Sequence, residues 1–182
     1  MSAQCKSLQK SLNDANKIIE DLQRRQLDFE RQAIKNNLRL VGYHEKEGEH
    51  AEEAVKIVQS ILETDSKRPD IVVENAYRVG KKQSGKVRQI VFRVRSFNHK
   101  LAIFSSRKTA LDKRNYYITD DLTEFDREHI SQLKPIIDQA MREKKNVKYR
   151  NGALFIDGQR YRGPIPAKSQ NTGPTSRIEQ SD

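Results

Sequence analysis

The side chains best suited to chemistry in this sequence are cations that gather in one stretch of the chain. Between Glu74 and Asp112 there is no Asp or Glu, although solvated surfaces normally mix the two signs of charge. A run of one sign is typical of a surface that binds phosphate groups. The cations of this basic stretch are Arg78, Lys81, Lys82, Lys86, Arg88, Arg93, Arg95, Lys100, Arg107 and Lys108. The sequence therefore predicts a polyanionic partner, and nucleic acid in particular.

Motifs of catalysis and of metal binding are missing from the sequence. It has no Gly-x-Ser-x-Gly elbow, no Walker phosphate loop and no His-Glu-x-x-His motif, so we expect a protein that is not an enzyme and needs no cofactor. The acidic, histidine-containing stretch 44–50 is expected to be a flexible loop and not a metal site, because Gly48 interrupts it. Asp120 and Asp121 precede a predicted helix and suit capping and dipole roles. The single cysteine, Cys5, excludes an intramolecular disulfide and a cysteine-based metal site.

Length and composition favour a modular chain over one large core. The chain has 182 residues and a formal net charge of +10, and only 35% of its residues are hydrophobic, which is low for a single large core. Residues 36–119 contain 17 basic and 10 acidic residues, so they carry +7 of the net charge. The N-terminus does not resemble a signal peptide and the apolar runs are short, so we expect an intracellular protein without a membrane span.

Residues 1–35 are predicted to form a coiled coil. Apolar residues recur three and four positions apart without Pro or Gly, and polar and charged residues fill the flanking positions. A helix docked on its own domain would carry a wider apolar stripe. The predicted oligomerisation seam is Leu8, Leu12, Ala15, Ile19, Leu22, Gln26, Phe29 and Ala33. Gln26 is a polar seam residue, and such residues help to fix register and strand number.

Residues 36–119 are predicted to form a domain with the order strand, helix, strand, strand, helix, strand. Strands are expected at 38–43, 71–79, 88–95 and 116–118, and helices at 51–62 and 99–108. Connections of helix length between strands favour a four-stranded antiparallel sheet backed by two helices, the ferredoxin-like βαββαβ arrangement. The predicted fold class is therefore α+β.

One face of this sheet is expected to bind single-stranded nucleic acid. If the apolar residues of 38–40 and 90–94 pack against the helices, the two-residue period of a strand sends the alternate residues to the other face. Those alternate residues are Arg39, Val41, Tyr43, Arg93 and Arg95. Such a face suits single strands because cations bind phosphates and aromatic rings stack on bases. For Tyr43 the sequence leaves a second interpretation open, a strand-end residue packed on a loop.

Residues 120–163 predict a small third domain. Thr123 is a candidate N-cap, and the acidic residues after it suit the first turn of a helix. Pro135 is expected to kink or break this helix. Two turn dipeptides, Asn-Gly and Asp-Gly, predict a three-stranded meander over residues 147–161. Residues 164–182 are rich in Pro, Ser, Gly and Asn and are expected to be disordered.

Several short motifs follow one another in a distinctive order. They are NNLRLVGY at 36–43, YRVG at 77–80, RQIVFRV at 88–94, FSSRK at 104–108, DDLT at 120–123, DR at 126–127 and LFIDG at 154–158. In this order they resemble the first-open-reading-frame protein of LINE-type (non-LTR) retrotransposons. The resemblance extends over residues 1–163, with the coiled coil matched by architecture alone.

The resemblance implies a homotrimeric coiled coil, an RNA-recognition-motif-like domain and a C-terminal domain that together coat the element's RNA. It also implies nucleic-acid chaperone activity, ribonucleoprotein particles and a part in retrotransposition. The RNA contacts that it implies are Arg78, Arg93 and Arg107. The chain departs from the family where Gln26 replaces an apolar residue of the trimer motif and where Ile90 replaces an aromatic residue of the standard RNA-recognition motif. It also lacks the closing helix of the family's C-terminal domain, so we expect a reduced domain or a truncated chain.

Together these observations predict a non-catalytic protein that multimerises and binds single-stranded RNA, with single-stranded DNA as the alternative. We expect it in cytoplasmic ribonucleoprotein particles, with the nucleus as a second location. A competing hypothesis is a coiled-coil adaptor whose α/β domain binds protein and shows no salt-dependent affinity for nucleic acid. Duplex DNA binding has less support, because no helix-turn-helix or zinc finger is visible. The candidate nucleic-acid-binding residues are Arg39, Tyr43, Arg78, Lys81, Lys82, Lys86, Arg88, Arg93, Arg95, Arg107 and Lys108.

Overall fold

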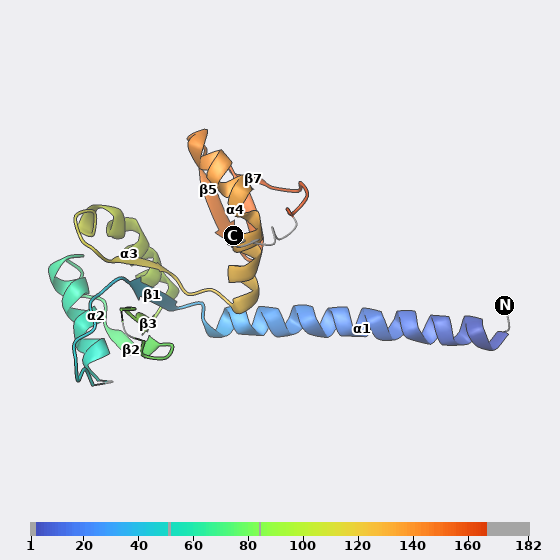
Figure 1. Ribbon diagram of the computed structural model, residues 1–182, viewed down its shortest axis with the longest axis horizontal. Helices are drawn as coiled ribbons and strands as arrows, with labels where there is room; N and C mark the ends of the chain where they lie inside the picture. The colour runs from blue at the N-terminus through green and yellow to red at the C-terminus, as the bar shows by residue number, and fades with distance from the viewer. Residues whose placement is uncertain (1–2, 51, 84, 167–182) are drawn as a thin grey trace, which may run out of the picture. The chain divides into compact units, whose positions relative to one another are not determined.

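The computed structural model describes residues 3–50, 52–83 and 85–166, without the side chains of Ala3, Lys108 and Thr109. These residues form an α+β fold with a long exposed N-terminal helix, a four-stranded antiparallel sheet with helices, and a small three-stranded sheet (Figure 1). The chain divides into two compact units, residues 1–123 and residues 124–182. The predicted α+β class is confirmed at this level.

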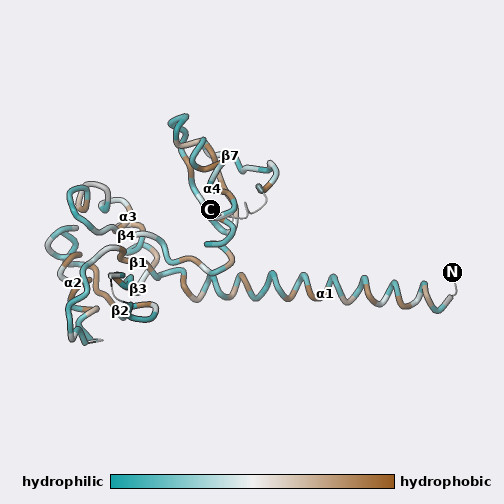
Figure 2. Tube along the Cα trace, viewed as in Figure 1, coloured by the Kyte–Doolittle hydropathy of each residue, from teal (hydrophilic) through white to brown (hydrophobic). Residues whose placement is uncertain are grey.

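The N-terminal helix α1 (Ala3–Ala33) runs for 31 residues without interruption. Its apolar residues recur among polar ones along its whole length (Figure 2). Within the single chain these apolar side chains are exposed, and Leu8, Leu12, Ile19, Leu22 and Phe29 each leave half or more of their surface open. The predicted helix is confirmed. The helix buries none of these large apolar seam side chains against its own chain, and the predicted coiled coil stays a prediction.

The sheet of the first unit contains four strands in the order β2-β3-β1-β4, all antiparallel to their neighbours. In chain order the elements are β1 (Asn37–Val41), α2 (Glu53–Thr64), β2 (Val73–Val79), β3 (Gln89–Val94), α3 (Phe97–Ala110) and β4 (Tyr117–Asp120). The predicted elements occur in the predicted order, with ends displaced by a few residues. The prediction of a four-stranded antiparallel sheet with helices is confirmed.

Alternation along the strands decides which face of the sheet the helices cover. Leu38 and Leu40 of β1 and the apolar residues of β3 at 90, 92 and 94 are almost fully buried in one core with α2 and α3. Both helices pack on this face, because the core includes Val58 of α2 and Ile103 of α3. Burial of a large aliphatic side chain contributes about 1.5–3 kcal/mol. The opposite face of the sheet is called the open face below.

The second unit consists of one helix and a meander. Helix α4 (Glu124–Arg142) continues through Pro135. Of the two expected effects of Pro135, a kink or a break, the break is therefore not observed. The strands β5 (Val147–Arg150), β6 (Ala153–Ile156) and β7 (Gln159–Arg160) pair in chain order, as predicted. Residues 164–166 have no regular secondary structure, and the rest of the predicted disordered tail, residues 167–182, lies outside the described residues.

Candidate nucleic-acid interface

Strand register assigns the residues of the open face. Tyr77 of β2 pairs with Val91 of β3, Val91 pairs with Arg39 of β1, and Arg39 pairs with Thr119 of β4. Cross-strand partners point to the same side of a sheet, and Val91 is outside the core cluster that contains its neighbours in β3. These four residues therefore form one row across the open face, in which Val91 is itself buried and Tyr77 is exposed. Arg93 belongs to the next row, opposite Asn75.

Two tyrosines are the exposed aromatic residues of this face. Tyr77 on β2 and Tyr117 on β4 leave 48% and 58% of their surface exposed. They lie on the two outer strands, and the spacing of strands and residues puts them about 16 Å apart. Neither tyrosine is among the nucleic-acid-binding residues predicted from the sequence. The alternation of side chains along each strand could have identified them. Tyr77 follows the buried Ala76 and Tyr117 precedes the buried Ile118, so both tyrosines point to the opposite face.

Tyr43 does not lie on the open face, which corrects the expectation from strand alternation. Strand β1 ends at Val41, and Gly42 adopts a positive φ of 84° that turns the chain toward the helices. A Cβ atom at Gly42 would lie 2.7 Å from the backbone oxygen of Asn115, so glycine is required there. Tyr43 instead packs against the core, edge to face with Tyr116 at a centroid distance of 5.2 Å. Its position agrees with the second interpretation left open by the sequence, in which Tyr43 is a packed residue beyond the strand end.

Arg78 lies on the helix-covered side of the sheet and is fully engaged by the protein. Its Nε and Nη2 atoms donate to the two carboxylate oxygens of Glu49 at 2.8 and 2.9 Å. Its remaining N–H groups donate to the backbone oxygens of Tyr43, His44 and Arg88 at 2.7–3.0 Å. A guanidinium has five N–H donors, and all five are used here. Arg78 therefore has no donor left for a phosphate in this structure.

Arg88 is held in a similar way by the same loop. Its Nη2 atom lies 2.6 Å from Glu45 Oε1, and its Nε atom also donates to this carboxylate. These hydrogen bonds hold the pKa of Glu45 at about 2, below its usual 4.5. Hydrogen bonds from Arg78 likewise hold the pKa of Glu49 below its usual value. Two carboxylates at 45–49 thus neutralise two arginines of the basic stretch.

The arginines of the open face also have partners. Arg39 donates to Asp121 Oδ1 at 2.6 Å and to Gln89 at 3.1 Å, and both charged groups are largely buried. Arg93 lies 3.6 Å from Glu74, but both side chains are about half exposed. An exposed pair of this kind is weak and screened by salt. Arg93 can therefore exchange its partner for a phosphate at a lower cost than Arg39.

Two further cations of the basic stretch, Arg107 and Lys100, are bound by other groups of the protein on the helix-covered side of the sheet. Arg107 donates from Nη1 to the backbone oxygen of Ile118 at 2.8 Å, and its guanidinium lies 4.4 Å from the ring centroid of Phe104. Burial lowers the pKa of Arg107 below its usual value. Lys100 is buried and donates to Asp120 at 2.5 Å. The carboxylates of Asp120 and Asp121 thus bind cations of the first unit.

The exposed cations that remain cluster at one loop and at the end of β3. Lys81, Lys82 and Lys86 are exposed on the loop between β2 and β3, and Arg95 is exposed just after β3. Lys82 lies 4.0 Å from Glu45, a weak contact. Within the described part of the chain, no carboxylate pairs with Lys81, Lys86 or Arg95. The side chain of Lys108, another candidate, lies outside the described residues.

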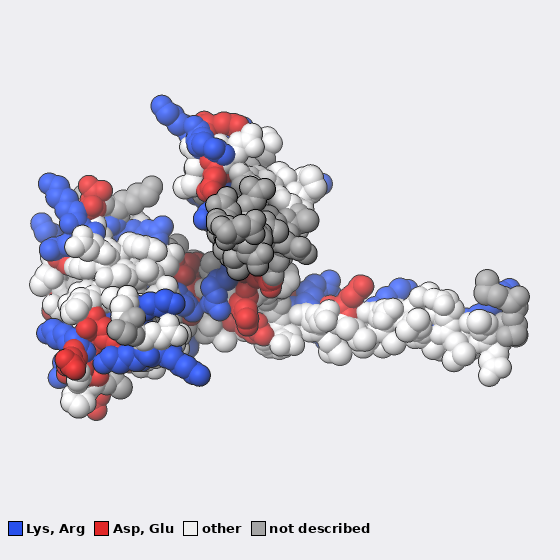
Figure 3. Space-filling model, in the orientation of Figure 1, with Lys and Arg blue, Asp and Glu red and all other residues white. Residues whose placement is uncertain are grey.

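Charge on the first unit is more evenly mixed than the sequence predicted. Figure 3 shows acidic and basic side chains interspersed over the unit that contains the sheet. The basic stretch lacks carboxylates of its own, but residues from other segments supply them. The residues that remain available to an anionic strand are the two tyrosines and Arg93 of the open face. Arg95 and the lysines of the β2–β3 loop extend this surface.

A scan of the chain against models of known protein families gives no match, and a comparison with curated proteins finds no significantly similar sequence. No helix among the described residues combines the length and apolar character that a membrane crossing needs. The same residues contain no cluster of His, Cys, Asp and Glu that could hold a metal ion.

Proposed function

We propose that this protein is a non-catalytic single-stranded RNA-binding protein that multimerises through α1. The observation that carries the proposal is that two exposed tyrosines, Tyr77 and Tyr117, share with Arg93 the sheet face opposite the helices. Aromatic rings on such a face stack with bases, and cations at its edge bind phosphates. The element order and strand order of the first unit are those of a ferredoxin-like fold, the arrangement used by RNA-recognition motifs.

The exposed seam of α1 supports multimerisation. A helix of 31 residues that leaves large apolar side chains in water gains stability when copies bury that seam together. A coiled coil would then tether several weak RNA-binding sheets. Binding of the second sheet becomes intramolecular, and this raises avidity by about 10²–10⁴ without a new contact. Such a protein coats long RNA with little sequence preference and can act as a nucleic-acid chaperone.

The decisive experiment compares binding isotherms for single-stranded RNA, single-stranded DNA and duplex at several salt concentrations. We expect the single strands to bind more tightly, with a log–log salt slope of about −0.7 for each neutralised phosphate. No affinity, or an affinity that salt leaves unchanged, would favour the alternative function, a coiled-coil adaptor whose α/β domain binds protein. The resemblance to LINE-type proteins makes retrotransposon RNA in ribonucleoprotein particles the expected ligand.

A further inference from the structure

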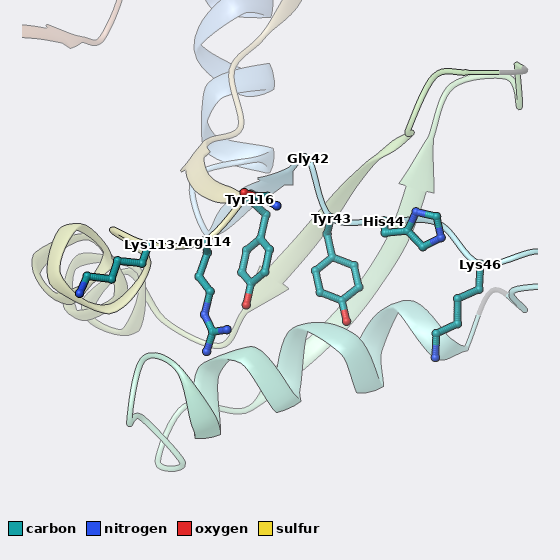
Figure 4. Close-up of a pocket in the computed structure, with 8 residues that line it drawn as sticks. Gly42, Tyr43, His44, Lys46, Lys113, Arg114 and Tyr116 are labelled. Atoms are coloured by element: carbon teal, nitrogen blue, oxygen red, sulfur yellow. The ribbon is translucent and has the colours of Figure 1, made fainter.

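A pocket of about 490 Å³ opens between two loops of the first unit (Figure 4). Gly42, Tyr43, His44 and Lys46 line it from the loop after β1, and residues 113–116 line it from the loop before β4. The volume is within the usual range for sites that bind small organic groups. The pocket lies beyond the end of the strands, and it is separate from the row of residues that defines the open face.

The lining of the pocket is basic. It includes Lys46, Lys113, Arg114 and His44, and none of its eight described residues is Asp or Glu. Arg114 pairs with Asp65 at 2.5 Å. In the part of the chain that the structure describes, no carboxylate pairs with the side chain of Lys46 or Lys113. Lys46 and Lys113 are exposed, and they stand at opposite ends of the group of side chains in Figure 4. This charge pattern suits an anion that spans the pocket.

Two tyrosine rings lie side by side between these lysines, with their hydroxyl groups toward α2 (Figure 4). The Tyr116 hydroxyl donates a hydrogen bond to Asp65 Oδ2, and burial together with this hydrogen bond raises the pKa of Tyr116 to about 12. Tyr43 meets Tyr116 edge to face at an interplanar angle of 64°. The arrangement is held in place because Gly42 lets the two loops approach closely. Aromatic surface between cations is the combination that binds a planar base with its phosphates.

The position of the pocket connects it to the open face. Val41 pairs with Tyr117 and Leu40 with Ile90, so the loops before β4 and between β2 and β3 lie at the same end of the sheet. Lys82 of the β2–β3 loop lies 4.0 Å from Glu45, the residue before Lys46. The lysines of the β2–β3 loop and the pocket therefore lie at the same end of the sheet, and Glu45, which also pairs with Arg88, lies between Lys82 and Lys46. A strand that leaves the open face at this end passes close to the pocket.

We propose that this pocket is a second nucleic-acid site, which takes one nucleotide of the same single strand that the open face binds. The base lies against the ring surface of Tyr43 and Tyr116, and phosphates farther along the strand on either side of that nucleotide contact Lys46 and Lys113. This inference rests on the proposed function, because it extends the path of the strand beyond the sheet.

The test compares two double variants in the full chain. Lys46→Ala with Lys113→Ala removes the two phosphate contacts, and Lys56→Ala with Lys134→Ala removes the same charge from exposed positions of α2 and α4. Affinity is measured against salt for oligouridylates of about 4 and about 16 nucleotides, the range of site sizes for small single-strand-binding domains. For the longer strand we expect the pocket variant to lower the magnitude of the salt slope by about 1.4, since each lost phosphate contributes about 0.7. The control variant keeps the parental slope.

Photocrosslinking supplies a second readout that does not depend on charge. A long strand that carries a photoreactive uracil is expected to form adducts with Tyr43 or Tyr116 in addition to Tyr77 and Tyr117. If adducts form only at Tyr77 and Tyr117, and the pocket variant has the same salt slope as the control variant, this inference is overturned and the proposed function stands. A parent protein that binds no strand overturns both. If uridine monophosphate occupies the pocket as tightly as the long strand does, the pocket is a free-nucleotide site and its place on the strand's path is wrong.

Discussion

Arg78 and Glu49 form a buried ion pair that joins the end of β2 to the loop before α2. Their side chains are only 6% and 3% exposed, and two N–H groups of Arg78 meet the two oxygens of Glu49. The same guanidinium also binds three backbone oxygens. Arg78 thereby connects the loop after β1 with the loop before β3. These contacts are those of a residue that stabilises the fold.

Replacing Arg78 should therefore destabilise the fold. Arg78→Ala leaves Glu49 buried without its cation, and removal of one partner of a buried pair costs about 3–5 kcal/mol. Denaturant unfolding monitored by circular dichroism measures this loss, with Lys81→Ala as the control from the same stretch, expected to remain within about 0.5 kcal/mol of the parent. An Arg78→Ala protein with parental stability but weaker RNA binding would instead identify Arg78 as an RNA contact.

Acid should weaken the same loop. The pKa of Glu45 is about 2 in the folded protein against an ordinary 4.5, and the pKa of Glu49 is also lowered. Because these values are depressed by folding, their stabilising effect is complete above pH 4.5 and is lost as the pH falls toward 2. The free energy of unfolding should decrease over this range, and it should decrease less in Glu45→Gln. Identical pH profiles for the parent and Glu45→Gln would contradict the assignment.

The two tyrosines of the open face should contribute directly to RNA affinity. Each of Tyr77→Ala and Tyr117→Ala should weaken binding of a single strand by about 1–3 kcal/mol, the usual value of one stacked base. Fluorescence anisotropy with a labelled oligonucleotide measures the change. Phe97→Ala is the matched control, since Phe97 is a similarly exposed aromatic residue that lies at the start of α3. Equal losses in all three variants would show that the open face is not the binding surface.

The seam of α1 should control the oligomeric state. Leu12→Asn with Leu22→Asn places polar groups in the seam and should yield monomers in sedimentation experiments. Lys10→Asn with Lys17→Asn changes the opposite side of the helix and should leave the oligomer intact. Deletion of residues 1–35 should give a monomer that still binds short oligonucleotides but has lost tight binding to long RNA. A parent chain that is already monomeric at micromolar concentrations would refute the coiled coil.

Cys5 offers a test of helix orientation that uses the native cysteine as the probe. It is the single cysteine of the chain and it lies on the heptad pattern of the seam. A disulfide requires Cα atoms about 4.4–6.8 Å apart, which copies of Cys5 reach in a parallel, in-register coiled coil and not in an antiparallel one. Mild oxidation should therefore give a covalent dimer that Cys5→Ser does not form. In a trimer one chain of each three keeps its thiol, whereas in a dimer none does.

Local patterns predicted the elements of this fold well. The alternation of Ile90, Phe92 and Val94 is strong enough to fix both the strand and its buried face, and the heptad pattern of α1 identifies a helix of nearly the observed length. The orientation of Tyr43 could not be predicted in the same way. A single glycine at position 42 adopts a positive φ and ends the alternation one residue before the tyrosine, and the sequence does not show whether such a glycine continues a strand or turns it.

The electrostatics of the site were the least predictable part. Counting charges along the basic stretch treats neighbours in sequence as neighbours in space, but Arg78 and Arg88 find their carboxylates about 30 and 43 residues away. Arg39 pairs with Asp121 across 82 residues. Only the register of β1 between β3 and β4 brings these groups together. The lysines of the β2–β3 loop are exposed, and their role in binding nucleic acid stays a prediction.

The strand order has a consequence for the time course of synthesis. β1 is made directly after α1, but it lies between β3 and β4, and β4 begins about 80 residues later. At about 5–20 residues per second, ribosomes need roughly 4–16 s to make that stretch. During this interval β1 has at least one hydrogen-bonding edge without its partner, while the complete α1 can already meet another nascent helix. If α1 forms the proposed coiled coil, chains translated side by side on one messenger would join before their sheets close. Each unpaired β1 would then be kept close to strands of its own kind.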